Sequence, residues 1–400
     1  MDLLFVCHRF PYPPDKGDKI RSWRFLDYLA ARHRVRVVAA ADDPADLAHV
    51  GALQSRVEAV RIVPFGRAAA ARRAAYALAT GRPLSVAWFP VGGLRAAARR
   101  LVRARRPDGV LAYSAQVAPA AFALGVPVVL DLVDRDSAKW AQYGAWLSPP
   151  RRWIYALEAR RLARAEERWI ERAAATLVIS AHEKSLFPDR LAPRLNVVRN
   201  PVRLESFSTD RSQEQPHTIL FAGALDYWPN RDAVSFYARE VMPRVRAAVP
   251  DAEFHVVGPR APAALTALAG RHGVRFLGYV ADIRAVYARA AVSVAPFRFT
   301  QGALNKVIEA MASAIPVVAT PRAVRGLEVA HGEGAWLGET ATELAAHTIA
   351  LLGDPAARRR LGTAGRRFVA ATLGWPGDLP RLDALLEAAF APASINAAVR

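Results

Sequence analysis

The sequence contains a single cysteine, Cys7, among its 400 residues. One cysteine excludes a disulfide bond within the chain, and it excludes any metal site that needs two cysteines from one chain. Cys7 lies in the first apolar run, where the ordinary role of a free cysteine is that of a small buried side chain. The shortage of cysteine suits a reducing compartment.

Long apolar runs are also missing. No run approaches the roughly 20 residues that a membrane-spanning helix needs. Residues 1–7 form a short apolar stretch with an acid at Asp2 and without the basic segment of a signal peptide. This stretch predicts a first β-strand. We therefore expect a cytoplasmic protein, or one that docks peripherally on the cytoplasmic face of the inner membrane.

Acidic residues are few relative to basic ones, since 55 Lys and Arg against 36 Asp and Glu give a net charge of +19. Such a balance indicates an anionic partner, which could be a nucleic acid, an anionic lipid or a phosphorylated substrate. Much of the excess is arginine in a chain rich in alanine and arginine, and a bias in genome composition would explain part of it without a function.

Two arginine-rich stretches lie in the N-terminal half of the chain. One holds Arg67, Arg72 and Arg73, and the other is a predicted helix that carries Arg151, Arg152, Arg160, Arg161, Arg164 and Arg168. The predicted helix also carries Tyr155, Leu162 and Trp169 at seven-residue spacing. Arginine-rich amphipathic faces suit an anionic lipid surface, and an ordinary solvated arginine face is the alternative. We expect peripheral docking near a lipid-linked glycan.

Short apolar runs alternate with helical patterns from one end of the chain to the other. This alternation predicts βαβ units and mainly parallel sheets in an α/β fold. Asn200-Pro201 interrupts it, and a polar stretch follows. We predict an N-terminal domain over residues 1–200, a linker over 201–215, a second domain over 216–375, and a C-terminal helix and tail over 376–400. In doubly wound domains, ligands bind at the carboxyl ends of the strands.

Five segments together carry a resemblance to a known family. They are Ser114 and the stretches 7–21, 131–140, 221–230 and 301–312. They closely resemble the retaining glycosyltransferases of family four, in particular the exosortase- or PEP-CTERM-associated exopolysaccharide branch. The likeness covers nearly the whole chain.

The resemblance implies two facing Rossmann-like domains, the GT-B fold, with the C-terminal helix packing back toward the N-terminal domain. It further implies a hexosyltransferase that moves a sugar from a nucleotide-diphosphate sugar to a glycan or lipid-linked acceptor, in exopolysaccharide or cell-envelope polysaccharide synthesis. Folds of this type need no metal, so we expect neither a metal site nor a cofactor beyond the donor substrate.

The donor site is predicted at the start of a helix near Asn305, which follows a loop containing Gly302. A helix N-terminus offers unpaired N–H groups to a diphosphate. Lys306 adds a cation in the first turn, and Glu309 lies one turn further on the same face. In the resembled family, such a lysine neutralises the donor phosphates. The glutamate is the second member of a Glu-x7-Glu motif and binds the ribose hydroxyls.

The first position of that motif holds Gln301 in this chain. A glutamine can hydrogen-bond a sugar hydroxyl, but it places no negative charge beside a developing oxocarbenium ion. We predict Gln301, Lys306 and Glu309 as the catalytic residues. The remaining donor-binding predictions are glycines for close backbone approach, at Gly17 and Gly223, and a loop for the nucleotide base, at Tyr279 and Val280.

The acceptor side is predicted at polar residues that follow strands of the N-terminal domain. His8 follows the first strand, Lys19 lies near the start of the first helix, and Asp131 and Asp134 follow the strand that ends at Leu130. These residues could bind acceptor hydroxyls or anionic groups, and each has a structural alternative as a satisfied polar side chain. No protein base is assigned, because a leaving phosphate can take the acceptor proton in a retaining transfer.

Other functions fit parts of the sequence. A nucleotide-sugar epimerase has the same fold and needs acid and base groups around the sugar. A glutamine at position 301 also fits a non-catalytic relative that binds a membrane or nucleic acid. The chain resembles no known RNA- or DNA-binding module, so we expect no nucleic-acid partner.

Overall fold

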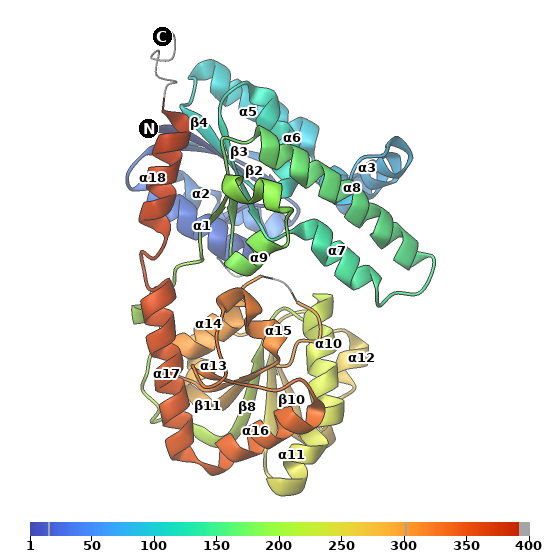
Figure 1. The fold of residues 1–400 in the computed structure, drawn as a ribbon, viewed down its shortest axis with the longest axis vertical. Coiled ribbons are helices and arrows are strands. Elements are labelled where there is room, and N and C mark those ends of the chain that lie inside the picture. The colour runs from blue at the N-terminus through green and yellow to red at the C-terminus, as the bar shows by residue number, and fades with distance from the viewer. Residues whose placement is uncertain (15–16, 301, 392–400) are drawn as a thin grey trace. The chain divides into compact units, whose positions relative to one another are not determined.

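The computed structural model describes residues 1–14, 17–300 and 302–391. Two compact units make up the chain. The first unit is Met1–Asn200 together with the segment that starts at Asp378, and the second is Pro201–Gly377. The boundary lies between Asn200 and Pro201, so that residues 201–215 belong to the second unit (Figure 1).

The first unit is built on a parallel sheet of seven strands within the described residues, in the order β3-β2-β1-β4-β5-β6-β7. Its central strands are almost continuously apolar because helices cover both faces of a parallel sheet. The strands are β1 (Asp2–Cys7), β2 (Arg34–Ala41), β3 (Ala59–Pro64), β4 (Gly109–Tyr113), β5 (Val128–Val133), β6 (Ala175–Val178) and β7 (Leu195–Val197).

The helices of the first unit follow these strands in βαβ order, and the last of them comes from the far end of the chain. They are α1 (Gly17–Ala30), α2 (Val50–Gln54), α3 (Arg67–Thr80), α4 (Leu84–Trp88), α5 (Val91–Ala104), α6 (Ala118–Ala121), α7 (Asp136–Gly144), α8 (Arg151–Arg172), α9 (Ala181–Ser185) and α18 (Leu379–Phe390).

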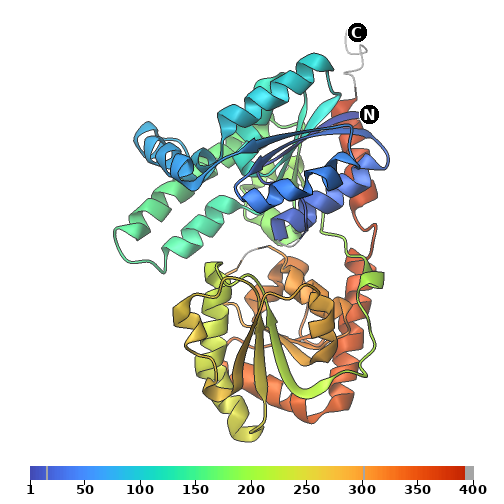
Figure 2. The same cartoon turned by 180° about the vertical axis from the view of Figure 1, so that it is seen from behind.

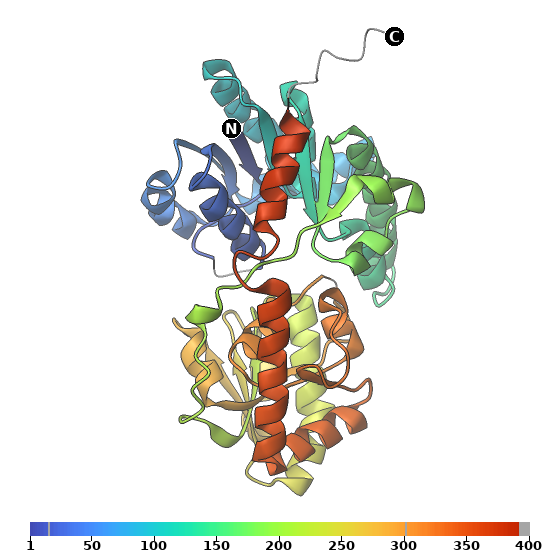
Figure 3. The ribbon, with the colours of Figure 1, turned by 60° about the vertical axis from the view of Figure 1, so that its left-hand side comes forward.

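The C-terminal helix α18 packs on the first unit, as the sequence predicts (Figure 3). Phe390 lies against β4 so closely that a Cβ atom at Gly109 would come within 2.3 Å of its ring. His33 Nε2 and Asp383 Oδ1 lie 2.5 Å apart and join the end of α1 to α18. The chain therefore returns to the first unit after it completes the second.

The second unit is built on a parallel sheet of six strands within the described residues, in the order β10-β9-β8-β11-β12-β13. The strands are β8 (Gln215–Ala222), β9 (Glu253–Val257), β10 (Val274–Gly278), β11 (Ala290–Ala295), β12 (Val317–Ala319) and β13 (Ala335–Leu337). The helices are α10 (Trp228–Phe236), α11 (Met242–Ala248), α12 (Ala263–Thr266), α13 (Ile283–Arg289), α14 (Asn305–Ala312), α15 (Pro321–Val324), α16 (Ala341–Gly353) and α17 (Pro355–Leu373).

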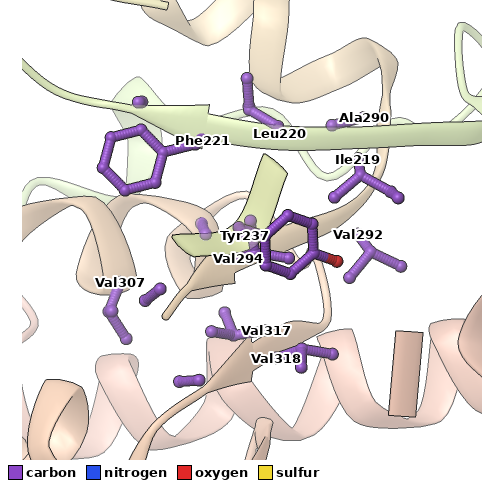
Figure 4. Close-up of a cluster of buried hydrophobic side chains, with 14 of the residues drawn as sticks. Ile219, Leu220, Phe221, Tyr237, Ala290, Val292, Val294, Val307, Val317 and Val318 are labelled. Atoms are coloured by element: carbon purple, nitrogen blue, oxygen red, sulfur yellow. The ribbon is translucent and has the colours of Figure 1, made fainter. Parts of the chain in front are cut away.

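The core of the second unit lies between this sheet and its helices. Figure 4 shows Phe221 and Tyr237 among the aliphatic side chains of the sheet. Tyr237 is fully buried, and its hydroxyl lies 2.9 Å from Thr348 Oγ1, which satisfies its polar end. The α/β fold class with two Rossmann-like units, predicted from the alternation of apolar runs and helical patterns, is confirmed.

Each sheet reverses its strand order beside its first strand. The reversal falls between β1 and β4 in the first unit and between β8 and β11 in the second. In open α/β sheets, ligands bind at the carboxyl ends of the strands at such a switch point. The residues that follow these four strands are therefore the candidates for function.

Candidate functional site

In the second unit, residues 296–300 and 302–304 lie between β11 and α14. Gly302 has a φ of +71°, a conformation that favours glycine. This loop lies directly on the 3-10 turn Arg325–Leu327, because a Cβ atom at Gly326 would come within 2.3 Å of the Gly302 carbonyl oxygen. Within the described residues, no side chain caps α14 at Leu304. The first N–H groups of this helix therefore lack a side-chain cap, and such groups can bind an anion.

Lys306 lies in the first turn of α14 and spans the switch point. Its Nζ donates to Asn230 Oδ1 at 2.7 Å and lies 4.2 Å and 4.6 Å from the ring centroids of Phe221 and Phe297. Asn230 Nδ2 in turn donates to the Ala224 carbonyl at 2.7 Å, which fixes the orientation of the amide. Burial lowers the pKa of Lys306 to about 7, although the Glu309 carboxylate acts to raise it.

Gly223, which follows β8, makes space beside this ammonium. A Cβ atom there would lie 2.5 Å from Lys306 Nζ and 2.9 Å from Asn230 Nδ2. The loop after β9 packs closely against the Gly223 backbone, since a Cβ atom at Gly258 would lie 1.9 Å from the Gly223 carbonyl oxygen. Gly258 also donates its N–H to the Gly278 carbonyl at 2.9 Å. Glycines thus follow β8 and β9 and end β10, and Gly223 leaves bare backbone beside Lys306.

Glu309 follows Lys306 by one turn and is held by a buried tyrosine on α13. The Tyr287 hydroxyl lies 3.3 Å from Glu309 Oε2 and 3.3 Å from the Lys306 carbonyl oxygen. Burial, and then the charge of Glu309, raise the pKa of Tyr287 well above its usual value. The tyrosine therefore stays protonated and donates its hydrogen to the cluster of Lys306, Glu309 and Asn230.

The other predicted donor residues have the following places. Asn305 is the first residue of α14. Tyr279 follows β10 and is 72% exposed, which leaves its ring open for stacking, whereas Val280 packs on the core of the unit. Gly17 begins α1 in the first unit. Gln301 lies outside the described residues.

The first unit carries a continuous line of polar contacts at the carboxyl ends of β1, β4 and β5. Ser114 Oγ lies 3.4 Å from His8 Nδ1 and also donates to Gln116 Oε1. Gln116 Nε2 donates to Asp136 Oδ2 at 3.0 Å. Lys139 Nζ then donates to Asp136 Oδ1 at 2.9 Å and to Asp134 Oδ2 at 3.2 Å. We call these six residues the polar chain: His8, Ser114, Gln116, Asp134, Asp136 and Lys139.

Asp18 orients the histidine of the polar chain. Its Oδ2 lies 3.6 Å from His8 Nε2 and accepts from Arg9 Nη1 at 3.0 Å. Burial alone would raise the pKa of Asp18, but His8 and Arg9 outweigh it and hold that pKa far below its usual range. A charged carboxylate behind one ring nitrogen favours a proton there, and it leaves the other nitrogen to face Ser114.

Lys19 and Asp131 have partners inside the first unit. Lys19 Nζ donates to Asp46 Oδ1 at 2.6 Å, and both residues are nearly fully buried. Asp131 accepts two hydrogen bonds from the fully buried Arg21, at 2.8 Å and 3.0 Å. The sequence interpretation placed both residues on the acceptor side, whereas the structure places them in buried ion pairs that tie α1 to its neighbours.

Several residues of both clusters had no role in the sequence interpretation. Asn230, Ser114 and Lys139 stand inside the segments that carry the family resemblance, so the signal for them was present. Tyr287 lies on a different helix from Glu309, 22 positions away, and no local pattern announces their contact.

Comparison with known proteins gives a family match for part of the second unit and a set of similar folds. Residues 216–354 match the family model described as glycosyl transferases group 1, and this range includes Gly223, Lys306 and Glu309. No curated protein sequence matches the chain.

Solved structures resemble the chain over nearly its whole length. HepE from Anabaena in complex with UDP is 15% identical, with a TM-score of 0.68 and coverage of 97% of this chain and 100% of that one. Sucrose-phosphate synthase from Thermosynechococcus elongatus is 16% identical, with a TM-score of 0.70 and coverage of 98% and 100%. A mutant of S. aureus TarM in a complex that contains UDP is 10% identical, with a TM-score of 0.65 and coverage of 98% and 100%. The chain thus has the GT-B fold.

Proposed function

We propose that this protein is a glycosyltransferase that takes a hexosyl group from a nucleotide-diphosphate sugar. The observation that carries the proposal is the cluster of Lys306, Glu309 and Gly223 around the start of α14, at the switch point of the second sheet. The match of residues 216–354 to group 1 glycosyl transferases supports it. HepE has been solved with UDP-glucose, which makes uracil the first base to test.

The donor diphosphate is assigned to the N-terminus of α14. There the N–H groups at the start of the helix and the Lys306 ammonium bind the negatively charged phosphates. As the bond between the sugar and the phosphate breaks, charge grows on the leaving oxygen, and Lys306 stabilises it most at that point. Gly223 leaves room for the phosphate beside the ammonium. Glu309, held by Tyr287, accepts hydrogen bonds from the ribose hydroxyls.

The acceptor hydroxyl is assigned to the polar chain of the first unit. His8, oriented by Asp18, and Asp136 offer acceptors, while Lys139 offers a donor. We propose a glycan or lipid-linked acceptor of exopolysaccharide or cell-envelope synthesis, which rests on the family resemblance. We also propose retention of configuration, with the departing phosphate oxygen taking the acceptor proton on the face that it leaves.

A panel of nucleoside diphosphates and their sugars tests this function by thermal shift. UDP, GDP and ADP are compared on wild type, on Lys306→Ala and on Lys184→Ala, which removes a lysine of the first unit as a control. We expect one nucleotide to raise the melting temperature of wild type and of the control, because a ligand that binds only the native state stabilises it. An unchanged shift in Lys306→Ala would refute the donor site, and no shift with any nucleotide would refute the function.

A further inference from the structure

The described residues expose nine large hydrophobic side chains, and five of them gather on two elements of the first unit. Trp146, in the turn between α7 and α8, and Trp153, in the first turn of α8, are 63% and 66% exposed. Tyr76 on α3 is 65% exposed. Leu78 on α3 and Ile154 on α8 complete the set. An exposed group of this kind marks a contact surface, since single scattered hydrophobic residues would need no explanation.

Hydrogen bonds join the two elements. Arg161 of α8 donates from Nη1 to the Ala77 carbonyl at 3.2 Å and from Nη2 to the Leu78 carbonyl at 3.0 Å. The C-terminal end of α3 is therefore joined to the middle of α8. Figures 1 and 2 show α3 and the α7–α8 hairpin projecting from the same side of the first unit.

This surface is strongly basic. Residues 59–107 contain eleven arginines and neither aspartate nor glutamate, and no acid lies between Asp136 and Glu158. The exposed arginines of α3, α8 and the turn after α3 have no carboxylate partner among the described residues: Arg67, Arg72, Arg82, Arg151, Arg152, Arg160, Arg164, Arg168 and Arg172. Their charge therefore faces solvent.

The two nearest acids on α8 face inward. Glu158 accepts from the Leu84 and Ser85 amides at 2.6 Å and 2.9 Å, at the start of α4. Glu166 accepts from the Ser137 amide at 3.0 Å, at the start of α7. Both carboxylates are fully buried, so they bind helix N-termini and do not neutralise the outer face.

The face that α8 exposes differs from the one that seven-residue spacing suggests. Leu162 and Trp169 are buried, and Tyr155 packs on Trp140 with ring centroids 4.7 Å apart. The outer stripe instead starts at Trp153 and continues with Arg160 and Arg164, seven and eleven positions further on.

We propose that the surface formed by α3 and the α7–α8 hairpin docks on an anionic phospholipid bilayer. Tryptophan beside an aliphatic residue at the tip of a hairpin suits the boundary between headgroups and acyl chains, and arginines around it suit lipid phosphates. Among residues 1–14, 17–300 and 302–391, no helix is long and apolar enough to cross a membrane. The contact is thus a surface contact, and it does not depend on the proposed transferase activity.

Vesicle flotation of the full chain tests this proposal. Wild type is mixed with vesicles of phosphatidylcholine alone and with vesicles that also contain phosphatidylglycerol, at low and high salt. Two variants probe the two parts of the surface. Trp153→Ala removes an exposed ring, and the pair Arg152→Glu with Arg160→Glu reverses two exposed charges. The matched controls are Leu47→Ala and the pair Arg359→Glu with Arg367→Glu, which change an exposed apolar residue and two exposed arginines elsewhere.

We expect wild type to float with the anionic vesicles and to bind the neutral ones weakly. Reversal of Arg152 and Arg160 should lower the apparent affinity by at least tenfold, since each basic residue near an anionic surface contributes roughly fivefold. Trp153→Ala should weaken binding at high salt as well, where charge is screened. No preference for anionic lipid would overturn the proposal. An equal loss of vesicle binding in the Arg359 and Arg367 pair would also overturn it. So would preferential binding of single-stranded DNA or of an acidic polysaccharide when either is added to compete with the anionic vesicles.

Discussion

Lys306 Nζ and Asn230 Oδ1 lie 2.7 Å apart and join the first turn of α14 to α10, across the two strands where the second sheet reverses its order. This hydrogen bond holds the ammonium over two phenylalanine rings in the absence of a ligand. A diphosphate at the start of α14 offers that ammonium stronger, charged acceptors than the neutral amide.

The affinity for the nucleoside diphosphate should therefore depend on pH through Lys306. With a pKa of about 7 in the free protein, the amine takes up a proton on binding above that pH, so affinity falls by roughly tenfold per pH unit until the pKa of the complex is reached. Below about pH 7, the lysine is charged in both states and contributes no slope. Isothermal titration calorimetry over a pH series measures this. Lys306→Arg should bind with a flat profile over the same range, because a guanidinium keeps its charge. Parallel profiles for the two proteins would contradict the assignment.

Glu309 should contact the ribose, and its charge also favours the charged form of Lys306. A double-mutant cycle measures this with Glu309→Ala and with a nucleotide that lacks both ribose hydroxyls. We expect the substitution to weaken binding of the ordinary nucleotide about tenfold, which is typical for a lost hydrogen bond to a charged group. The dideoxy nucleotide should lose less affinity in the variant, because only the effect of the carboxylate on Lys306 remains. Equal losses with both nucleotides would show that Glu309 does not contact the ribose.

Two neighbouring glycines should respond differently to alanine. In Gly223→Ala, the new methyl group meets the ends of the Lys306 and Asn230 side chains, which can move, so nucleotide affinity should fall and the melting temperature should drop less than in Gly258→Ala. In Gly258→Ala, the methyl group meets the Gly223 carbonyl at 1.9 Å, and backbone cannot give way. That variant should lose stability, by about 1–3 kcal/mol. Thermal melts and calorimetric titrations of both variants provide the comparison, and reversed effects would contradict the geometry.

The buried pair of Arg21 and Asp131 should matter for stability. Asp131→Asn leaves a buried arginine without its charged partner, and breaking such a pair costs about 3–5 kcal/mol. Asp27→Asn is the matched control, because it breaks the pair with the exposed Arg56 and should cost less than about 1 kcal/mol. Urea unfolding followed by circular dichroism measures both. A loss below about 1 kcal/mol for Asp131→Asn would mean that this carboxylate is free for another role.

The parts of the fold that depend on local pattern could be predicted from the sequence. Apolar runs indicated the strands, and the β11-to-α14 segment was recognised from Gly302, Asn305, Lys306 and Glu309. Contacts with distant partners could not be predicted in this way. Asp131 follows a strand like a ligand-binding acid, but its partner Arg21 lies 110 positions earlier. No local pattern contains that contact.

Helix faces gave a similar difficulty. Tyr155 and Trp153 stand two positions apart on α8, and either could have marked its outer side. The choice depends on which stripe packs on α7 through Trp140, and that is a tertiary contact. Local amphipathicity therefore predicted the helix, whereas its exposed stripe is set by the packing of α8 on α7, which the sequence pattern does not show.

A crystal structure with the nucleoside diphosphate that stabilises the protein tests the central claim most directly. The account predicts phosphate density at the N-terminus of α14, with Lys306 Nζ turned from Asn230 to a phosphate oxygen and Glu309 at the ribose. Density for the nucleotide anywhere else, with the bond between Lys306 and Asn230 intact, would contradict it.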